Sequence, residues 1–265
     1  MNFLNIEENK IGEEFKKNGF IIRKIHNFNE LKKIYNLVEK NLHLELSKFS
    51  NNTSKIKLDN AHKEIDKNQL NSIRIAIINS LNADNQFKKI YYNLSKFFLD
   101  ILVGNELCMQ KRVNLSIQIP NDRSSLLDIH SDVWSGDSPF EVVVWIPLVN
   151  CYQTKSMYLL PPSKYKKFES FFQLINKKSS NELFNKFKND LIYLKVNYGE
   201  ILIFNQCLPH GNVVNKTKET RWSFNCRFKG LFTPYRDKKI GEFFEPITLR
   251  PISEIALDYK SPKIL

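Results

Sequence analysis

Two histidines and one aspartate have the types and spacing of a metal-binding set. His130 and Asp132 lie two positions apart, so in an extended segment both side chains project from the same face and can bind one ion. His210 follows a predicted strand, in the segment 208–212 (LPHGN). Two imidazoles and one carboxylate form a facial triad, which leaves coordination positions open on a mononuclear iron(II). The pattern predicts a catalytic metal site.

A pair of residues suited to carboxylate binding follows His210. Arg221 lies eleven positions after it, and Ser223 two positions further. A guanidinium binds a carboxylate through two parallel hydrogen bonds, and a hydroxyl at i+2 of a strand faces the same side. We estimate the chance coincidence of this pair with the His-x-Asp motif at under about 2%.

Together these motifs resemble those of the iron(II)- and 2-oxoglutarate-dependent oxygenases, whose double-stranded β-helix carries His-x-Asp, a distal His and Arg-x-Ser. The resemblance covers residues 114–228. The segments 115–118 (LSIQ), 130–140 (HSDVWSGDSPF) and 145–149 (WIPLV) look more narrowly like oxygenases of bacterial sporadic carbohydrate-biosynthesis clusters, which are relatives of the phytanoyl-CoA dioxygenase superfamily.

The resemblance implies a role for each motif residue. His130, Asp132 and His210 would bind iron(II), and Arg221 and Ser223 would hold the cosubstrate 2-oxoglutarate. With O2 as the oxidant, the expected activity is hydroxylation, or another oxidation, of a sugar or sugar-containing intermediate in bacterial carbohydrate or polysaccharide biosynthesis.

Other polar residues are candidates because of their strand positions. Gln118 lies on a predicted strand upstream of the metal motif, so it is either a ligand of the cosubstrate or a hydrogen-bonded core amide. Asn225 and Arg227 continue the alternation of Arg221 and Ser223, and we expect them to face the barrel interior and contact substrate. Lys155 is a candidate for a second carboxylate anchor, although Arg221 already fills that role.

Residues near the metal motif complete the candidate set. Trp134 and Ser135 lie in a glycine-containing loop, where substrate contacts commonly occur. Asp128 is expected to orient an imidazole N–H through its carboxylate. Trp145 is assigned to the core because it lies in the most apolar predicted strand.

The elements that must position these residues change character near residue 107. Helical spacing with capping residues is seen before it, and alternating or β-branched apolar segments follow it. The order predicts an α+β chain in which a β-sandwich or barrel is backed by helices; the resemblance specifies a double-stranded β-helix (jelly-roll, cupin-like). The expected helices are 7–17, one after Asn27 to about 38, 65–81 and 84–103, with a loop at 50–57. The expected strands are 20–25, 113–119, 142–149, 157–160, 192–196, 200–204 and 221–232.

We expect a single oxygenase domain over residues 1–265. Residues 1–106 would be mainly helical support, and 107–232 the β-helix core with a helical insertion at 163–190. Residues 233–265 would form an extended C-terminal tail over the core.

Composition limits the partners and the compartment. The formal net charge is +12, but only 8 of the 40 basic residues are Arg and they are dispersed. Nucleic-acid sites concentrate Arg, so we expect no nucleic-acid partner and instead a small-molecule or saccharide substrate, which this charge would favour as an anion. The longest apolar run is far below the ~18 residues of a membrane span. Four widely spaced cysteines indicate free thiols and a cytoplasmic protein.

The sequence leaves two alternatives open. The first is a cupin-like, metal-dependent sugar epimerase or lyase that does not use 2-oxoglutarate. The second is a non-catalytic barrel that binds carbohydrate or nucleic acid through its basic surface. The sequence predicts no oligomeric state.

Overall fold

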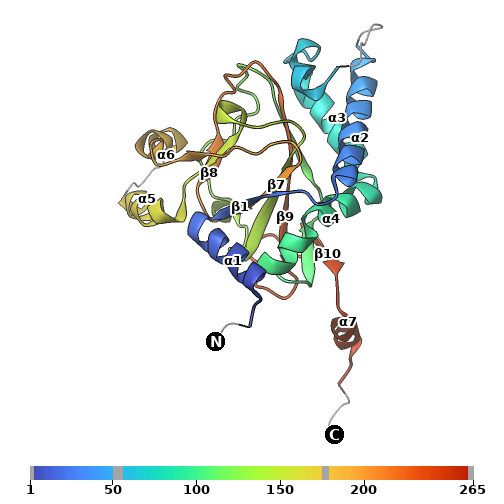
Figure 1. The fold of residues 1–265 in the computed structure, drawn as a ribbon, viewed down its shortest axis with the longest axis vertical. Coiled ribbons are helices and arrows are strands. Elements are labelled where there is room, and N and C mark those ends of the chain that lie inside the picture. Colours follow the sequence, from blue (N-terminus) through green and yellow to red (C-terminus); the bar gives the residue numbers. More distant parts are fainter. Residues whose placement is uncertain (1–2, 50–55, 175–178, 262–265) are drawn as a thin grey trace.

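Two antiparallel sheets hold the predicted site between them. The computed structural model describes residues 3–49, 56–174 and 179–261 (Figure 1). The larger sheet has the order β1 (Phe20–Lys24), β7 (Glu200–Asn205), β4 (Glu141–Pro147), β9 (Arg221–Gly230), β2 (Leu107–Gln110) and β10 (Phe244–Thr248), with β3 (Asn114–Gln118) also paired to β9. The smaller sheet has the order β6 (Ile192–Tyr193), β5 (Met157–Leu159) and β8 (His210–Asn212).

Successive side chains of strand β9 point to opposite faces of the larger sheet, so one set packs in the core and the other faces the predicted site. Phe224 and Phe228 lie on its outer face against α4 (Asn85–Leu102), where the rings of Phe87 and Phe224 are 5.3 Å apart. On the same face, the Tyr91 hydroxyl donates to the Val144 carbonyl of β4 at 2.8 Å. The intervening residues of β9 therefore face the space between the sheets.

Helices cover the outer face of the larger sheet, as Figure 1 shows for α2 (Phe28–Leu46), α3 (Leu70–Asn82) and α4. Capping residues stabilise the starts of two of these helices: the side chains of Asn27 and Asp84 accept hydrogen bonds from backbone N–H groups in the first turns of α2 and α4. Helix α1 (Ile6–Asn18) ends at Gly19, whose φ of 78° is the left-handed conformation typical of a helix C-terminus.

One predicted helix begins later than expected. The helix predicted over 65–81 is α3, which starts at Leu70, because the Asp66 carboxylate accepts the Asn68 N–H at 2.7 Å and forms a turn instead. A short 3-10 helix, η1 (Leu58–Lys63), precedes this turn. Most of the predicted loop 50–57 lies outside the described residues.

The helical insertion is present as α5 (Pro162–Leu174) and α6 (Ser180–Phe187). Phe168 and Phe187 of these helices pack with Tyr158 of β5 in a second, smaller core. The strand expected over 192–196 is shorter: β6 ends at Tyr193, and Val196 forms an isolated bridge with Cys151.

The prediction of an extended tail over the core is wrong for the end of the chain. Strand β10 does join the edge of the larger sheet through β2, but Pro251 then starts α7 (Pro251–Asp258). Proline at the first helical position is already set for the helical φ. Figure 1 shows α7 projecting from the body, and all its side chains are at least partly exposed.

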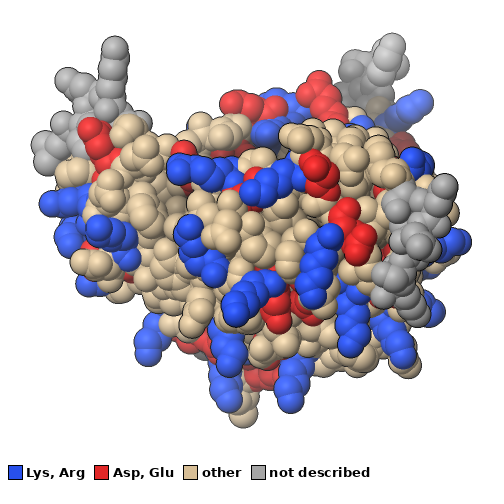
Figure 2. Space-filling view, turned by 90° about the horizontal axis from the view of Figure 1, so that it is seen from above, with Lys and Arg blue, Asp and Glu red and all other residues tan. Residues whose placement is uncertain are grey.

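The surface carries dispersed charge. On the face drawn in Figure 2, Lys and Arg side chains alternate with Asp and Glu and with uncharged residues. Among the described helices, none is both long and apolar enough to cross a membrane.

Candidate active site

The two histidines of the motif face each other across a backbone pair. The N–H of His130 donates to the carbonyl of His210 at 2.9 Å, and the N–H of His210 donates to the carbonyl of His130 at 2.8 Å. The two imidazole centroids are 4.4 Å apart. Antiparallel pairing therefore brings together two residues that are 80 positions apart in the chain.

Asp132 completes the set from a different local structure than expected. It starts a 3-10 helix, η2 (Asp132–Ser135), rather than continuing an extended strand. Its Oδ1 lies 3.5 Å from Nε2 of His130 and 3.8 Å from Nε2 of His210. One ligand atom from each residue lies within 4.8 Å of the others, which suits a single ion. The predicted triad is thus assembled, although the backbone reason for it differs.

Backbone carbonyls orient both imidazoles. Nδ1 of His130 lies 2.6 Å from the Asp128 carbonyl, and Nδ1 of His210 lies 2.8 Å from the Leu208 carbonyl. With Nδ1–H donating, each ring presents Nε2 as the ligand atom. Asp128 does orient the His130 ring, but through its backbone carbonyl and not, as expected, through its carboxylate. The Asp128 carboxylate instead accepts a hydrogen bond from the Ser180 hydroxyl at 3.0 Å.

Burial and charge set the protonation of the triad. Burial lowers the pKa of His210 to about 4, so this imidazole is neutral near pH 7. Burial also lowers the pKa of His130, but the hydrogen bonds with the Asp132 carboxylate and the Asp128 carbonyl, together with the charge of Asp132, outweigh it and the net shift is upward. Burial would raise the pKa of Asp132, yet the His130 hydrogen bond and the charge of Arg227 hold it well below its usual range. The set offers one anionic and two imidazole ligands.

The triad lines a cavity of about 90 Å³ between the sheets. The Arg221 guanidinium lies in the same cavity, 2% exposed, and donates to the Ser116 hydroxyl at 2.8 Å. Burial lowers the pKa of Arg221. Among the described residues, no carboxylate lies within ion-pair distance of it. The cavity therefore holds a buried cation that lacks a counter-ion.

Buried polar atoms near this guanidinium also lack partners. Within the described part of the chain, Nε of Arg221, Oγ of Ser223 and Oε1 of Gln118 form no hydrogen bond. Gln118 and Arg221 are directly opposite each other in the β3–β9 pair, with Ser116 opposite Ser223. Buried polar groups are normally satisfied, so the free donors of Arg221 and Ser223 fit an anionic ligand such as the distal carboxylate of 2-oxoglutarate. Gln118 instead behaves as a core amide: its side-chain N–H donates to the Val213 carbonyl at 2.6 Å, and its Oε1 can only accept a hydrogen bond.

Asn225 and Arg227 line the same cavity, as the strand alternation predicts. Arg227 is committed to the metal set: its Nη2 lies 2.8 Å from Oδ2 of Asp132, and its Nε lies 3.3 Å from Oδ1 of Asp137. The structure thus places Arg227 on Asp132, a candidate metal ligand, whereas the strand alternation had led us to expect contact with substrate.

Trp134 and Ser135 lie outside the residues that line this cavity. The Trp134 ring is 40% exposed and stacks on Phe172 of α5 with centroids 4.7 Å apart. Ser135 is exposed at the end of η2. Trp145 is buried as expected, but it also contributes to the cavity wall.

Lys155 is not a second carboxylate anchor. It ends the 3-10 helix η3 (Gln153–Lys155), is fully buried, and pairs with Asp59 at 2.9 Å and Glu219 at 2.7 Å. These two carboxylates neutralise the lysine, which leaves it no role in the cavity. The ion pair instead ties η1 to the segment before β9.

This chain resembles known proteins in its fold and not detectably in its sequence. No protein-family model matches the chain, and a search of curated proteins finds no match. Solved structures do match. A nickel complex of the non-heme monooxygenase ThoJ has a TM-score of 0.57 and 13% identity, covering 90% of this chain and 84% of that chain. EctD from S. alaskensis, with 2-oxoglutarate and 5-hydroxyectoine, has a TM-score of 0.55 and 13% identity, covering 88% and 78%.

HygX from Streptomyces hygroscopicus, with nickel, 2-oxoglutarate and hygromycin B, has a TM-score of 0.51 and 15% identity, covering 89% of this chain and 91% of that chain. The fold is that of non-heme oxygenases. The likeness to these structures confirms the predicted double-stranded β-helix backed by N-terminal helices.

Sequence reasoning missed the residues that support this oxygenase-fold site. The Gln206 side chain accepts a hydrogen bond from Nε of Arg227 at 3.1 Å and donates one to the Glu141 carboxylate at 2.8 Å. The backbone carbonyl of Gln206 accepts a hydrogen bond from the Asp132 N–H at 3.2 Å. Ser116, which accepts a hydrogen bond from Arg221, could have been found from the sequence, because it lies two positions before Gln118 and therefore on the same face of the predicted strand. Gln206 could not, since its role depends on contacts between distant segments.

Proposed function

We propose that this protein is an iron(II)- and 2-oxoglutarate-dependent dioxygenase. The observation that carries the proposal is Arg221, a buried cation with no counter-ion among the described residues, in the cavity that the His130, Asp132 and His210 triad also lines. A cupin-like metal enzyme that does not use 2-oxoglutarate has no need of such a guanidinium, and a binding module has no need of the triad. Both alternatives leave part of the cavity unexplained.

Each side chain has a distinct task in this proposal. His130, Asp132 and His210 would bind iron(II), and the hydroxyl of Ser223 and the Arg221 guanidinium would bind the distal carboxylate of 2-oxoglutarate. The bound iron and cosubstrate would supply the oxidising chemistry with O2. Apolar side chains of the cavity wall would limit the access of water to the reacting groups; they are Val143, Met157 and Phe204.

The substrate class is part of the proposal. HygX and EctD are solved with small polar molecules, hygromycin B and 5-hydroxyectoine, beside 2-oxoglutarate. The motif segments of this chain look like those of oxygenases in carbohydrate-biosynthesis clusters. We therefore favour hydroxylation, or another oxidation, of a sugar or sugar-containing intermediate. The whole chain would act as one oxygenase domain, in the cytoplasm, where its four free cysteines stay reduced.

The test is an anaerobic titration of iron(II) and then 2-oxoglutarate, followed by visible absorption. We expect a weak metal-to-ligand charge-transfer band in the wild type, because 2-oxoglutarate chelates the metal. Arg221→Ala should weaken 2-oxoglutarate binding at least about tenfold, since it removes charge-assisted hydrogen bonds. Arg250→Ala, at an exposed arginine outside the cavity, is the matched control and should bind as the wild type does.

Removing a buried arginine can disturb the fold, so Ser223→Ala provides a milder variant. It should weaken 2-oxoglutarate binding by a smaller factor while the circular dichroism spectrum stays unchanged. His130→Ala should abolish succinate formation. Metal binding without the band would identify a metalloenzyme of another kind, and absence of metal binding would contradict the whole site.

A further inference from the structure

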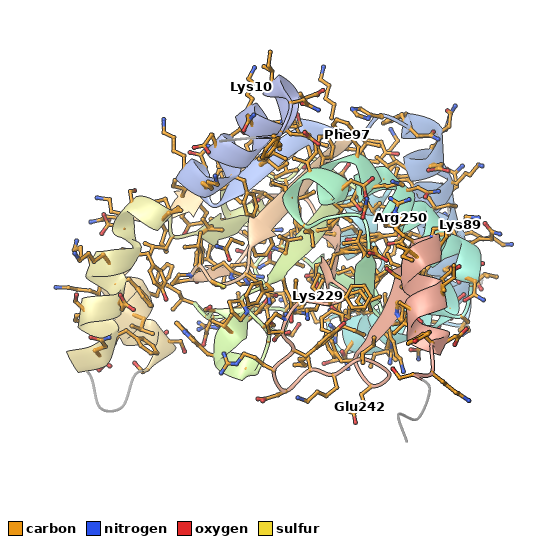
Figure 3. All side chains as sticks on the ribbon, turned by 90° about the horizontal axis from the view of Figure 1, so that it is seen from below. Lys10, Lys89, Phe97, Lys229, Glu242 and Arg250 are labelled. Atoms are coloured by element: carbon orange, nitrogen blue, oxygen red, sulfur yellow. The ribbon has the colours of Figure 1, made fainter. Side chains whose placement is uncertain are left out.

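A second cavity lies beside the metal cavity and is lined by basic residues. Its volume is about 520 Å³, and we call it the basic pocket. Three cations line it: Arg74 of α3, and Lys111 and Arg112 of the turn between β2 and β3. The carboxylate in its lining is Glu242, which Figure 3 shows at the outer edge of the molecule.

None of the three cations is neutralised by another described residue. Arg74 donates to the Asn71 side chain at 2.6 Å, Arg112 donates to the Asn79 side chain at 2.6 Å, and Lys111 donates to a backbone carbonyl. Each of these partners is uncharged and occupies one donor only. Arginine has five N–H donors and lysine three, so most donors remain for a ligand.

Two side-chain pairs connect the basic pocket to the metal cavity. Asn114 lines the basic pocket and donates to Asn225, which lines the metal cavity, at 3.1 Å. Gln110 lines the basic pocket and accepts from Arg227, which lines the metal cavity, at 3.2 Å. Uncharged amides, which suit hydroxyl groups, therefore lie at the boundary between the two cavities.

Building on the proposed oxygenase function, we infer that the basic pocket binds the phosphate or diphosphate group of the substrate. Clustered guanidinium groups match phosphate geometry through paired hydrogen bonds, and three cations exceed what a single carboxylate requires. The sugar end of such a phosphorylated sugar or sugar nucleotide would lie against Asn114 and Asn225, nearer the metal. The proposed substrate class is thus phosphorylated saccharides.

Inorganic pyrophosphate is the probe that tests this pocket. Calorimetric titration of the full chain is done without metal and with EDTA, so that the probe cannot bind through iron. Saturating 2-oxoglutarate is added to compete for Arg221. We expect one site, and the double variant Arg74→Gln/Arg112→Gln should weaken binding at least about tenfold because it removes two charge-assisted partners. Single variants should have intermediate effects.

Two control variants locate the site. Arg250→Gln removes the same charge from outside the pocket, and Arg221→Gln removes the cation of the metal cavity; both should bind pyrophosphate within about twofold of the wild type. The inference is overturned if the wild type shows no saturable binding, if the double variant binds normally, or if Arg221→Gln loses binding while its circular dichroism spectrum matches that of the wild type. Because this titration needs neither iron nor the charge-transfer band, its failure is distinguishable from failure of the oxygenase proposal.

Discussion

Arg227 holds the oxygen of Asp132 that points away from the imidazoles. The Arg227 Nη2 to Asp132 Oδ2 distance is 2.8 Å, whereas Oδ1 faces both histidine Nε2 atoms. The carboxylate is therefore fixed so that one oxygen is available as a ligand. Such an outer partner sets the rotation of the carboxylate and keeps it ionised.

Replacing this guanidinium should weaken metal binding. We predict that Arg227→Met lowers iron(II) affinity by about 10- to 100-fold, because the lost orientation of Asp132 outweighs the relief of charge repulsion with the metal. Arg227→Lys keeps the positive charge but not the planar guanidinium, so its iron(II) affinity should lie between those of the wild type and Arg227→Met. Chelator competition measures the affinities, with Arg250→Met as the control for charge loss. Unchanged affinity in Arg227→Met would show that Asp132 needs no such partner.

Glu141 predicts a pH dependence of stability. Its side chain is 2% exposed, and burial raises its pKa to about 6 from 4.5. Below pH 4.5 the Glu141 carboxyl is neutral in both the folded and the unfolded protein. Between pH 4.5 and about 6 it ionises in the unfolded protein only, and above about pH 6 the folded protein holds a buried carboxylate. Stability is therefore lost as pH rises through that window, by about 2 kcal/mol from this group.

Glu141→Gln should remove this dependence. A glutamine at position 141 is a weaker hydrogen-bond partner for Gln206 than Glu141, and this loss of stability is the same at every pH. The quantity to compare is therefore the difference in unfolding free energy between variant and wild type as a function of pH. This difference should move in favour of the variant by about 2 kcal/mol between pH 4.5 and pH 7. Urea denaturation at matched pH values measures it, and a difference that stays constant with pH would mean that Glu141 titrates normally.

The helices and strands could be predicted from local patterns, whereas the triad and the double-stranded β-helix were predicted from the motifs and the family that they resemble. His130 and Asp132 are close in sequence, and the alternation along β9 fixes which of its residues share a face. The partners of these residues could not be predicted in the same way. Gln206 contacts Asp132 and Arg227 only because β7 and β9 both flank β4, and strand order does not follow from one sequence.

Lys155 illustrates the opposite error. A lysine beside a predicted strand near the site suggested a ligand anchor, yet Asp59, far earlier in the chain, supplies a carboxylate that neutralises it. Arg221 is as deeply buried but has no such carboxylate among the described residues. Residue type and strand position are similar for the two cations, and only the long-range partner separates a structural ion pair from a candidate ligand site.

The Lys155 ion pair should therefore contribute to stability and not to cosubstrate binding. We predict that Lys155→Met lowers the free energy of unfolding by about 1 to 3 kcal/mol, because the lost bonds are partly offset by hydration of the half-exposed carboxylates. The 2-oxoglutarate dissociation constant should stay within about twofold, since Arg221 is intact. A marked loss of 2-oxoglutarate affinity with unchanged stability would restore the anchor role that the structure argues against.

Gly211 keeps its neighbour His210 in register with His130. A Cβ at Gly211 would lie 2.6 Å from both the Leu127 carbonyl and the Tyr158 hydroxyl oxygen. Gly211→Ala must therefore push β8 away from the loop before His130, and we predict a loss of about 1 to 3 kcal/mol in unfolding free energy together with weaker iron binding. Gly12 in α1 has open space around its Cβ position, so Gly12→Ala should instead gain up to about 1 kcal/mol. Denaturation and chelator competition on both variants separate a local effect on the triad from a general effect of the added methyl group: equal behaviour of the two variants would contradict the role assigned to Gly211.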